Sequence, residues 1–306
     1  MTDQNWRALT LDWGALTKAE KDAWHPPATG CIVLRMPDDI YHAGPGYSSS
    51  QLKVITAKSE LHFKAAPPIK NTKALKVGRV LHAFVLEPET VDGRFLFRPG
   101  LDARTKKGKE ALAEAEATGL EVIREDPAQL EAIAAAVHEH PAWRYIVGAE
   151  PLVEPSIYWT DEETGLLLRV RPDNLNPHFG QTGKFAMCVD LKSAADARDR
   201  KFRNQVRDLG YDFSAAMYCD GVRQLLGRHC AWAWFVFEKE APWATRVIYA
   251  GEKWLGRGRT LYRNAVTRLK QAEDTGRWPG YDNGKAVELE FTRWDELAQG
   301  DTKWTK

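Results

Sequence analysis

Two stretches decide the fold of this chain: Leu167-Leu168-Arg169-Val170-Arg171-Pro172-Asp173 and Met187-Cys188-Val189-Asp190-Leu191-Lys192. Each carries an acid at or near its end, and Asp190 lies seventeen residues after Asp173. Residues i and i+2 of a strand point to the same face, so Asp190 and Lys192 are expected to share one pocket. Two carboxylates offer hard oxygen ligands to Mg²⁺ or Mn²⁺. The pattern therefore predicts a divalent metal site with a lysine beside it.

A D...D-x-K spacing is typical of metal-dependent nucleases, in which the lysine reaches the phosphate that the metal binds. The triplet alone also occurs by chance, and a surface ion pair is the alternative interpretation. His82, within an apolar segment, could likewise be a hydrogen-bonded core histidine. Tyr218 could simply pack its ring and bond through its hydroxyl. The nuclease hypothesis depends on these residues acting together.

The composition indicates a globular protein with a sizeable core, because the 306 residues are 43% apolar and include 12 Trp. The polar start and the absence of an apolar run of about 18 residues argue against export and membrane insertion, so a cytoplasmic location is expected. The four cysteines form no C-x-x-C pair and are expected to be buried thiols.

The net charge of +1 means that affinity for nucleic acid would have to come from a local patch. The candidate patch follows the second acid and consists of Arg198, Arg200, Lys201, Arg203 and Arg207. Asp196, Asp199 and Asp208 lie among these cations. A solvated, charge-rich helix face is therefore an equally open interpretation.

The apolar periodicity predicts an α/β protein whose central mixed sheet is flanked by helices. Helices are expected from Ser48, over 74–86, from 127 to before Pro141, over 196–207, 211–227 and 252–274. Strands are expected over 156–160, 166–171, 185–191, 230–238 and 244–250, with a polar loop between Asp173 and the third of them. Lys106-Lys107-Gly108-Lys109 is expected in a mobile loop or an exposed turn.

A set of ordered motifs resembles the RecE-type, exodeoxyribonuclease VIII-like branch of the PD-(D/E)XK nuclease superfamily. The motifs are Tyr41-His42-Ala43-Gly44-Pro45-Gly46 with Ser48-x-Ser50-Gln51-Leu52, Gly78-x-x-Leu81-His82 with Leu86-Glu87-Pro88-Glu89, Ser156-Ile157-Tyr158-Trp159, Arg171-Pro172-Asp173, Val189-Asp190-Leu191-Lys192, Tyr218-x-Asp220-Gly221 and Trp278-Pro279-Gly280-Tyr281. The similarity spans residues 36 to 294. It implies a single PD-(D/E)XK exonuclease domain over 36–306, preceded by an extension of uncertain order over 1–35.

The resemblance implies a role for each matching residue. His82, Asp173 and Asp190 would hold the catalytic Mg²⁺, with Mn²⁺ as the other candidate. Lys192 would orient or activate the water and offset charge on the phosphate. Glu87 is a candidate supporting residue next to the site. DNA contacts are expected from Arg198, Lys201, Arg203 and Tyr218.

One position departs from the family pattern. Many relatives carry a glutamine four residues before the motif tyrosine, where this chain has Ser214. A hydroxyl reaches less far and cannot copy the paired donor and acceptor of an amide. Positioning of the DNA end is therefore expected to differ, unless Gln205 or Gln224 replaces the amide.

These observations lead to a metal-dependent exonuclease that degrades linear double-stranded DNA, 5′ to 3′, as the resemblance implies. It would leave 3′ single strands for a strand-annealing protein in phage or prophage recombination, and would form a ring-shaped homo-oligomer. The alternatives are a structure-specific or endonucleolytic PD-(D/E)XK nuclease in repair or defence, and a catalytically weak protein that binds DNA ends.

Overall fold

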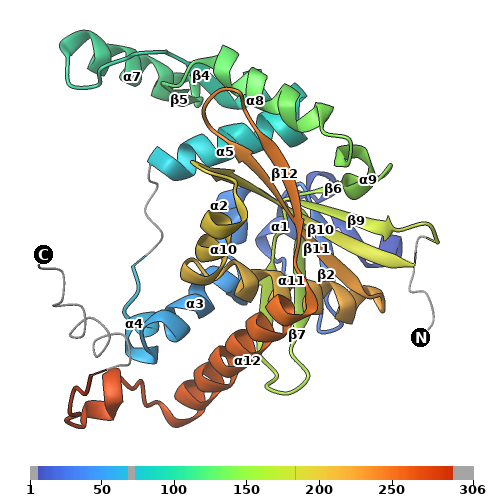
Figure 1. Ribbon diagram of the computed structural model, residues 1–306, viewed down its shortest axis with the longest axis vertical. Coiled ribbons are helices and arrows are strands. Elements are labelled where there is room, and N and C mark those ends of the chain that lie inside the picture. Colours follow the sequence, from blue (N-terminus) through green and yellow to red (C-terminus); the bar gives the residue numbers. More distant parts are fainter. Residues whose placement is uncertain (1–5, 68–72, 183, 292–306) are drawn as a thin grey trace, which may run out of the picture.

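The computed structural model describes residues 6–67, 73–182 and 184–291. The residues predicted to complete the domain, 292–306, lie outside these ranges. No helix within the described ranges is both long enough and apolar enough to cross a membrane. Within these ranges the chain forms two five-stranded sheets and a small parallel pair, with helices packed around them (Figure 1).

The central sheet is mixed and has the strand order β12-β11-β10-β9-β6. Its strands are β6 (Leu152–Val153), β9 (Asn174–Phe179), β10 (Phe185–Ala194), β11 (Cys230–Glu238) and β12 (Thr245–Tyr249). β10 pairs in parallel with β11 and antiparallel with β9. Apolar residues fill β10 and β11 because helices cover both faces of this sheet.

Strand β9 corrects one prediction, because its residues were expected in a polar loop. Asn174 pairs with Val189 of β10, which brings Asp173, the residue before β9, alongside Asp190. The sequence of β9, Asn-Leu-Asn-Pro-His-Phe, has few β-forming residues and contains a proline. Pairing with β6 and β10 forms this strand, and local propensity does not predict it.

The second sheet has the order β1-β2-β7-β8-β3. Its strands are β1 (Thr10–Asp12), β2 (Cys31–Leu34), β3 (Tyr47–Ser48), β7 (Ser156–Thr160) and β8 (Leu167–Val170). β7 and β8 form the predicted antiparallel hairpin. β1 and β2 lie within the first 35 residues, so residues 6–34 pack into the same body as the rest of the chain.

The remaining elements are helices, short 3₁₀ turns and the small parallel pair. The α-helices are α1 (Lys18–Asp22), α2 (Asp38–Ala43), α3 (Ser49–Ala57), α4 (Glu60–Lys64), α5 (Lys73–Leu86), α6 (Val91–Arg94), α7 (Lys106–Thr118), α8 (Pro127–Glu139), α9 (Trp143–Val147), α10 (Asp199–Asp208), α11 (Tyr211–Leu226) and α12 (Glu252–Thr275). The 3₁₀ turns are η1 (Trp6–Leu9), η2 (Trp13–Ala15), η3 (Pro88–Thr90) and η4 (Tyr281–Gly284), and the small pair is β4 (Phe95–Phe97) with β5 (Glu121–Ile123).

Helix α7 corrects a second prediction. Lys106-Lys107-Gly108-Lys109 was expected in a loop or turn, but it forms the first turn of this helix. Thr105 and the carbonyl of Asp102 organise the turn before it, where the Thr105 hydroxyl accepts the Gly108 N–H. A long alanine-rich and glutamate-rich segment follows, and its helix propensity outweighs the local charge.

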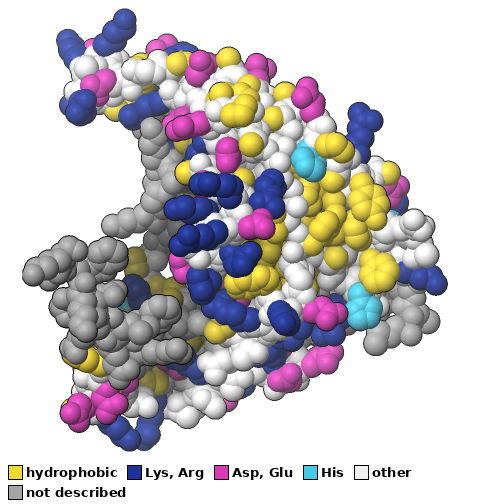
Figure 2. Space-filling model, in the orientation of Figure 1, with side chains coloured by type: hydrophobic (Ala, Val, Ile, Leu, Met, Phe, Trp, Pro, Cys, Tyr) yellow, Lys and Arg dark blue, Asp and Glu magenta, His cyan; other side chains and the backbone are white. Residues whose placement is uncertain are grey.

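Helices on one face of the central sheet form the α5/α8 core, which contains Val80, Leu81, Ile133, Val189 and Phe235. Figure 1 shows α7, β4, β5 and α8 at one end of the molecule and α4 with α12 at the other. Between these two ends, one side of the molecule is hollowed (Figure 2).

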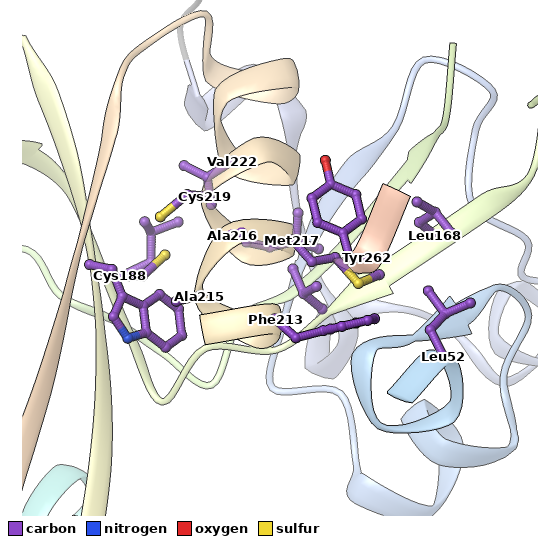
Figure 3. Packing of buried hydrophobic residues seen from close by; sticks show 14 of the residues in the cluster. Leu52, Leu168, Cys188, Phe213, Ala215, Ala216, Met217, Cys219, Val222 and Tyr262 are labelled. Carbon is purple, nitrogen blue, oxygen red and sulfur yellow. The ribbon is translucent and has the colours of Figure 1, made fainter. Parts of the chain in front are cut away.

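Helix α11 packs between the two sheets and forms the centre of the α11 core. Cys188 of the central sheet lies on one side of the helix, and Leu168 of the second sheet lies on the other (Figure 3). Close packing depends on Gly221, because a Cβ there would lie 2.6 Å from the ring of Trp159. The two sheets and α11 therefore hold the ends of β9 and β10 in a fixed arrangement.

Candidate functional site

Four of the predicted residues come together where β9 begins, beside the middle strand of the central sheet, β10. His82 comes from α5, Asp173 precedes β9, and Asp190 and Lys192 lie on β10. His82 Nδ1 is 3.6 Å from Asp173 Oδ1, and Lys192 Nζ is 2.5 Å from Asp190 Oδ2. Their side chains are between 15% and 23% exposed, so the group is recessed but open to solvent. We call these four residues the candidate site.

Packing of the neighbouring elements places each of these side chains. Leu81 and Ala83 are buried in the α5/α8 core, which leaves His82 between them at the surface of that core. The backbone N–H of Leu191 donates a 2.6 Å hydrogen bond to Asp173 Oδ2. This bond fixes the carboxylate of Asp173, and its other oxygen faces His82.

The candidate site concentrates negative charge in a partly dry environment. Burial raises the pKa of Asp190, and the nearby charge of Asp173 raises it further, while Lys192 opposes the change. Burial alone would lower the pKa of Lys192, but Asp190 and Asp173 more than offset this, so the pKa is raised. Lys192 therefore stays protonated and balances one of the two carboxylates.

Glu154 is a further acid at the site that sequence reasoning missed. Its Oε1 lies 4.0 Å from His82 Nδ1, and its N–H donates to the carbonyl of Asp173. Burial and the charge of Asp173 raise the pKa of Glu154. The residue has a φ of 42°, a left-handed conformation that is uncommon for side chains other than Gly and Asn. No spacing in the sequence signals it, because contact with Asp173 places it there.

The imidazole and carboxylate groups at the candidate site are of the chemical types that bind a hard divalent cation. One imidazole and three carboxylates, those of His82, Asp173, Asp190 and Glu154, lie near one another. Burial is the main cause of the raised pKa values of Asp190 and Glu154, and the charge of Asp173 adds to it. Within the described ranges, however, no three His, Cys, Asp or Glu side chains already converge at metal-ligand distances. Lys192 holds one oxygen of Asp190, so a cation would compete with that ion pair.

Tyr218 and Ser214 lie on α11 behind the candidate site. Burial, and next the charge of Asp190, raises the pKa of Tyr218 to about 12. Its ring packs edge-on against Trp232, 5.4 Å between centroids. The Ser214 hydroxyl donates to Ser49 at the start of α3, 3.3 Å away, so Ser214 joins two helices.

The predicted role of Glu87 has no support in its contacts. Glu87 follows the end of α5 and forms a 3.4 Å ion pair with Arg94. No hydrogen bond or ion pair within the described ranges links it to the candidate site. Gln224 is also engaged elsewhere, because its amide donates to the carbonyl of Thr160.

The basic residues after β10 lie on α10 and at its N-cap. Figure 2 shows that Lys and Arg side chains gather on the hollowed side of the molecule, in the region of α10. Arg198 is paired with Asp196 at 2.7 Å. Lys201 and Arg203 are exposed and form no ion pair within the part of the chain that the structure describes. These two cations are therefore available to an anionic ligand.

Comparison with families of known proteins gives a match over most of the chain. A model of a PDDEXK-like domain of unknown function, DUF3799, matches residues 48–289. The chain belongs to this PDDEXK-like family. The matched range contains all four residues of the candidate site and Glu154. No curated protein matches the chain.

A solved structure shares the fold of this PDDEXK-like protein. The crystal structure named "Putative exonuclease" from Eubacterium rectale has a TM-score of 0.54 at 16% identity, and the alignment covers 87% of this chain and 99% of that one. SSO0001 (12% identity, covering 63% of this chain and 86% of that one) and VC1899 from Vibrio cholerae (10%, covering 79% and 58%) have TM-scores of only 0.26 and 0.23. The predicted fold, an α/β core with a mixed sheet flanked by helices, is confirmed.

The first motif of the resemblance has a structural role in this PDDEXK-like chain. The buried guanidinium of Arg169 donates to the carbonyls of His42, Gly44 and Pro45 and lies 5.0 Å from the ring of Tyr41. These bonds fix the loop that leads into α3. The motif therefore orients the helix whose first residue, Ser49, contacts α11.

Proposed function

We propose that the protein is a divalent-metal-dependent DNA exonuclease of the RecE type. The observation that carries this proposal is the meeting of His82, Asp173, Asp190 and Lys192 beside β10, the middle strand of the central sheet. Membership of a PDDEXK-like family supports nuclease chemistry. The exonuclease name of the Eubacterium rectale structure is consistent with an end-dependent reaction.

The residues of the candidate site would divide the work of hydrolysis. His82, Asp173 and Asp190 would hold Mg²⁺ or Mn²⁺, which supplies positive charge to the scissile phosphate and acidifies a bound water. Lys192 would orient the attacking water and offset negative charge that grows on the phosphate in the transition state. Its release from Asp190 would accompany metal binding, because both cations compete for the same carboxylate.

The proposed polarity, product and oligomeric state follow from the resemblance to RecE-type exonucleases. The enzyme would degrade one strand of a duplex from its 5′ end and leave a 3′ single strand for an annealing protein. A ring-shaped homo-oligomer would keep it on the DNA. Lys201 and Arg203 on α10, with Arg198 at its N-cap, would contact phosphates near the candidate site.

The test is release of nucleotides from linear duplex DNA labelled at the 5′ or the 3′ end, with Mg²⁺ and then Mn²⁺. We expect release of the 5′ label by the wild type and its loss in Asp190→Asn, which keeps the shape of the side chain. Asp208→Asn is the matched control, because Asp208 is an exposed acid on α10. Its activity should equal that of the wild type.

A second substrate, closed circular DNA, distinguishes an exonuclease from an endonuclease. An exonuclease needs an end and leaves circles intact, whereas an endonuclease cuts them. Early release of the 3′ label would reverse the proposed polarity. Tight binding of DNA ends without any hydrolysis would reject the catalytic proposal. The protein would then be one that has a nuclease fold and binds DNA ends without cutting them.

A further inference from the structure

A cavity of about 360 Å³ lies beside α10 and includes none of the candidate-site residues. Its walls come from α10, from β11 and β12 at the edge of the central sheet, and from the first turn of α12. Phe202 and Trp234 line its interior, and the half-buried Trp254 lines it from α12. Arg203 and Arg246 contribute positive charge. The cavity therefore combines aromatic surfaces with cations.

One of the aromatic residues that line the cavity has a hydrogen-bond donor without a partner. Trp234 is 1% exposed, and its indole Nε1 has no hydrogen-bond partner within the described ranges. A buried donor without a partner is unfavourable. A ligand with an aromatic face would pack against the rings that line the cavity, and acceptor atoms on it would suit a donor of this kind. Nucleobases have both properties.

The charge of the cavity favours an anion. Arg246 is held by Asp199 at 2.6 Å and donates to the carbonyl of Ala197. Arg203 is exposed and forms no ion pair in the part of the chain that the structure describes. One full positive charge thus remains beside the pair of Arg246 and Asp199. A phosphate beside a stacked base would match it.

Contacts between side chains connect the cavity to the candidate site. Lys192 Nζ lies 5.1 Å from the ring centroid of Tyr211, and that ring lies 6.2 Å from the ring of Phe202 in the cavity. Two ring contacts therefore separate Lys192 from the cavity, and a DNA strand held at the candidate site and running along α10 would pass near it. Bases in a duplex are stacked and paired, so only an unpaired strand can place a base inside.

We propose that this cavity binds a base of single-stranded DNA, with Trp254 as the stacking surface and Arg203 as the phosphate contact. The inference rests on the proposed function, since an exonuclease that degrades one strand leaves the other unpaired near its active site. Stacking on an aromatic side chain contributes about 1–3 kcal/mol per base and tolerates any base.

The test measures binding of a fluorescent 12-nucleotide oligothymidylate and of a blunt duplex in EDTA, where hydrolysis cannot interfere. We expect Trp254→Ala to weaken binding of the single strand about 5-fold to 100-fold. The loss for the duplex should be clearly smaller. Trp254→Phe should retain most of the affinity, because phenylalanine still stacks. Trp243→Ala is the matched control, because Trp243 is half-buried and does not line the cavity.

A second measurement keeps the test decisive if Trp254→Ala fails to fold. Photo-cross-linking of wild-type protein to an oligonucleotide with one 5-iodouracil, followed by mass spectrometry, should locate the base on the peptides that line the cavity. Wild-type affinity of Trp254→Ala, equal losses for single strand and duplex, or cross-links that all lie elsewhere would each overturn the inference. Absence of hydrolysis in Mg²⁺ with these binding results intact would reject only the proposed function.

Discussion

Lys192 and Asp190 lie two residues apart on the same face of β10, and the Lys192 ammonium is 2.5 Å from Asp190 Oδ2. The pair is recessed, so neither group is fully screened by water. Lys192 thus neutralises the carboxylate that the metal would need. One of the two carboxylates of the candidate site is therefore already paired with a cation before a metal ion binds.

Replacing Lys192 by methionine tests this relationship. We expect Lys192→Met to lower kcat about 10²-fold to 10³-fold, as for loss of one electrostatic group in a transition state. Its affinity for Mn²⁺ should be retained or increased, because Asp190 is released from its ion pair. Nucleotide release and isothermal titration with Mn²⁺ measure the two effects. Lys184→Met, at an exposed lysine before β10, is the control. Weaker Mn²⁺ binding in Lys192→Met would contradict the assigned role.

Glu154 is expected to contribute to metal affinity. Glu154→Gln removes one carboxylate from the site while keeping its size, so the Kd for Mn²⁺ should rise about 10-fold, which corresponds to roughly 1.4 kcal/mol. Titration calorimetry measures this without reference to catalysis. Glu150→Gln provides the comparison, because Glu150 is an exposed acid paired with Arg7. Equal Kd values for the wild type, Glu154→Gln and Glu150→Gln would show that Glu154 does not contribute to metal binding.

Lys53 gives the stability of the protein a defined dependence on pH. Burial, and next the charge of Lys192, lowers the pKa of Lys53 to about 8. The unfolded chain, with an ordinary lysine pKa, therefore binds more protons than the folded chain between about pH 8 and 10.5. The contribution of Lys53 to the free energy of unfolding should rise with pH across this window, since the penalty for burying its charge is relieved.

The measurement is denaturant unfolding at pH 7.5, 8.5 and 9.5 in EDTA, for the wild type and Lys53→Met. The difference between the two proteins should favour Lys53→Met most at pH 7.5 and shrink as the pH rises. Lys58→Met, at the exposed lysine that caps the C-terminus of α3, should show no such trend. A constant difference across the three pH values would argue against a buried, titrating Lys53.

The cations of α10 should differ in their effect on DNA affinity. Each phosphate contact contributes about 0.9 to the slope of log K against log salt concentration. The double variant Lys201→Ala/Arg203→Ala should therefore reduce the slope by about 2. Arg198→Ala should change it less, because Asp196 already neutralises Arg198. Fluorescence anisotropy with blunt duplex at several salt concentrations gives these slopes. Equal slopes for the wild type and all variants would show that α10 does not contact DNA.

Arg169 is expected to be essential for stability. Its side chain is 2% exposed and bonds three backbone carbonyls, so Arg169→Met would leave those acceptors without partners. We expect a loss of about 3 kcal/mol in the free energy of unfolding. Arg98→Met should be nearly neutral, because Arg98 is exposed and, within the described ranges, its side chain bonds only the carbonyl of its neighbour Phe97. Denaturant unfolding compares the two, and an effect under 1 kcal/mol for Arg169→Met would contradict the assignment.

Local signals in the sequence predicted much of the fold. Ser48 and Gln51 form the capping box that begins α3, and Asp126 caps α8. A turn ending in Gly165 joins β7 to β8. Each of these features depends on residues close together in the chain. Sequence patterns can therefore detect them.

The features that the sequence did not predict depend on long-range contacts. Strand β9 exists because it pairs with β10, and Glu154 reaches the candidate site through its bond to Asp173. In the candidate site, Asp190 and Lys192 follow from strand geometry, whereas His82 required the family resemblance. Nothing in the spacing of the chain relates a helix residue at 82 to a strand ninety residues later.

The candidate site joins elements that belong to different hydrophobic cores. His82 is carried by α5 in the α5/α8 core, whereas the opposite face of β10 packs in the α11 core. Local unfolding of the α5/α8 core would carry His82 away and leave the α11 core intact. The inactivation temperature of the protein would then lie below the temperature at which most of its structure melts, and activity would report the integrity of a single core.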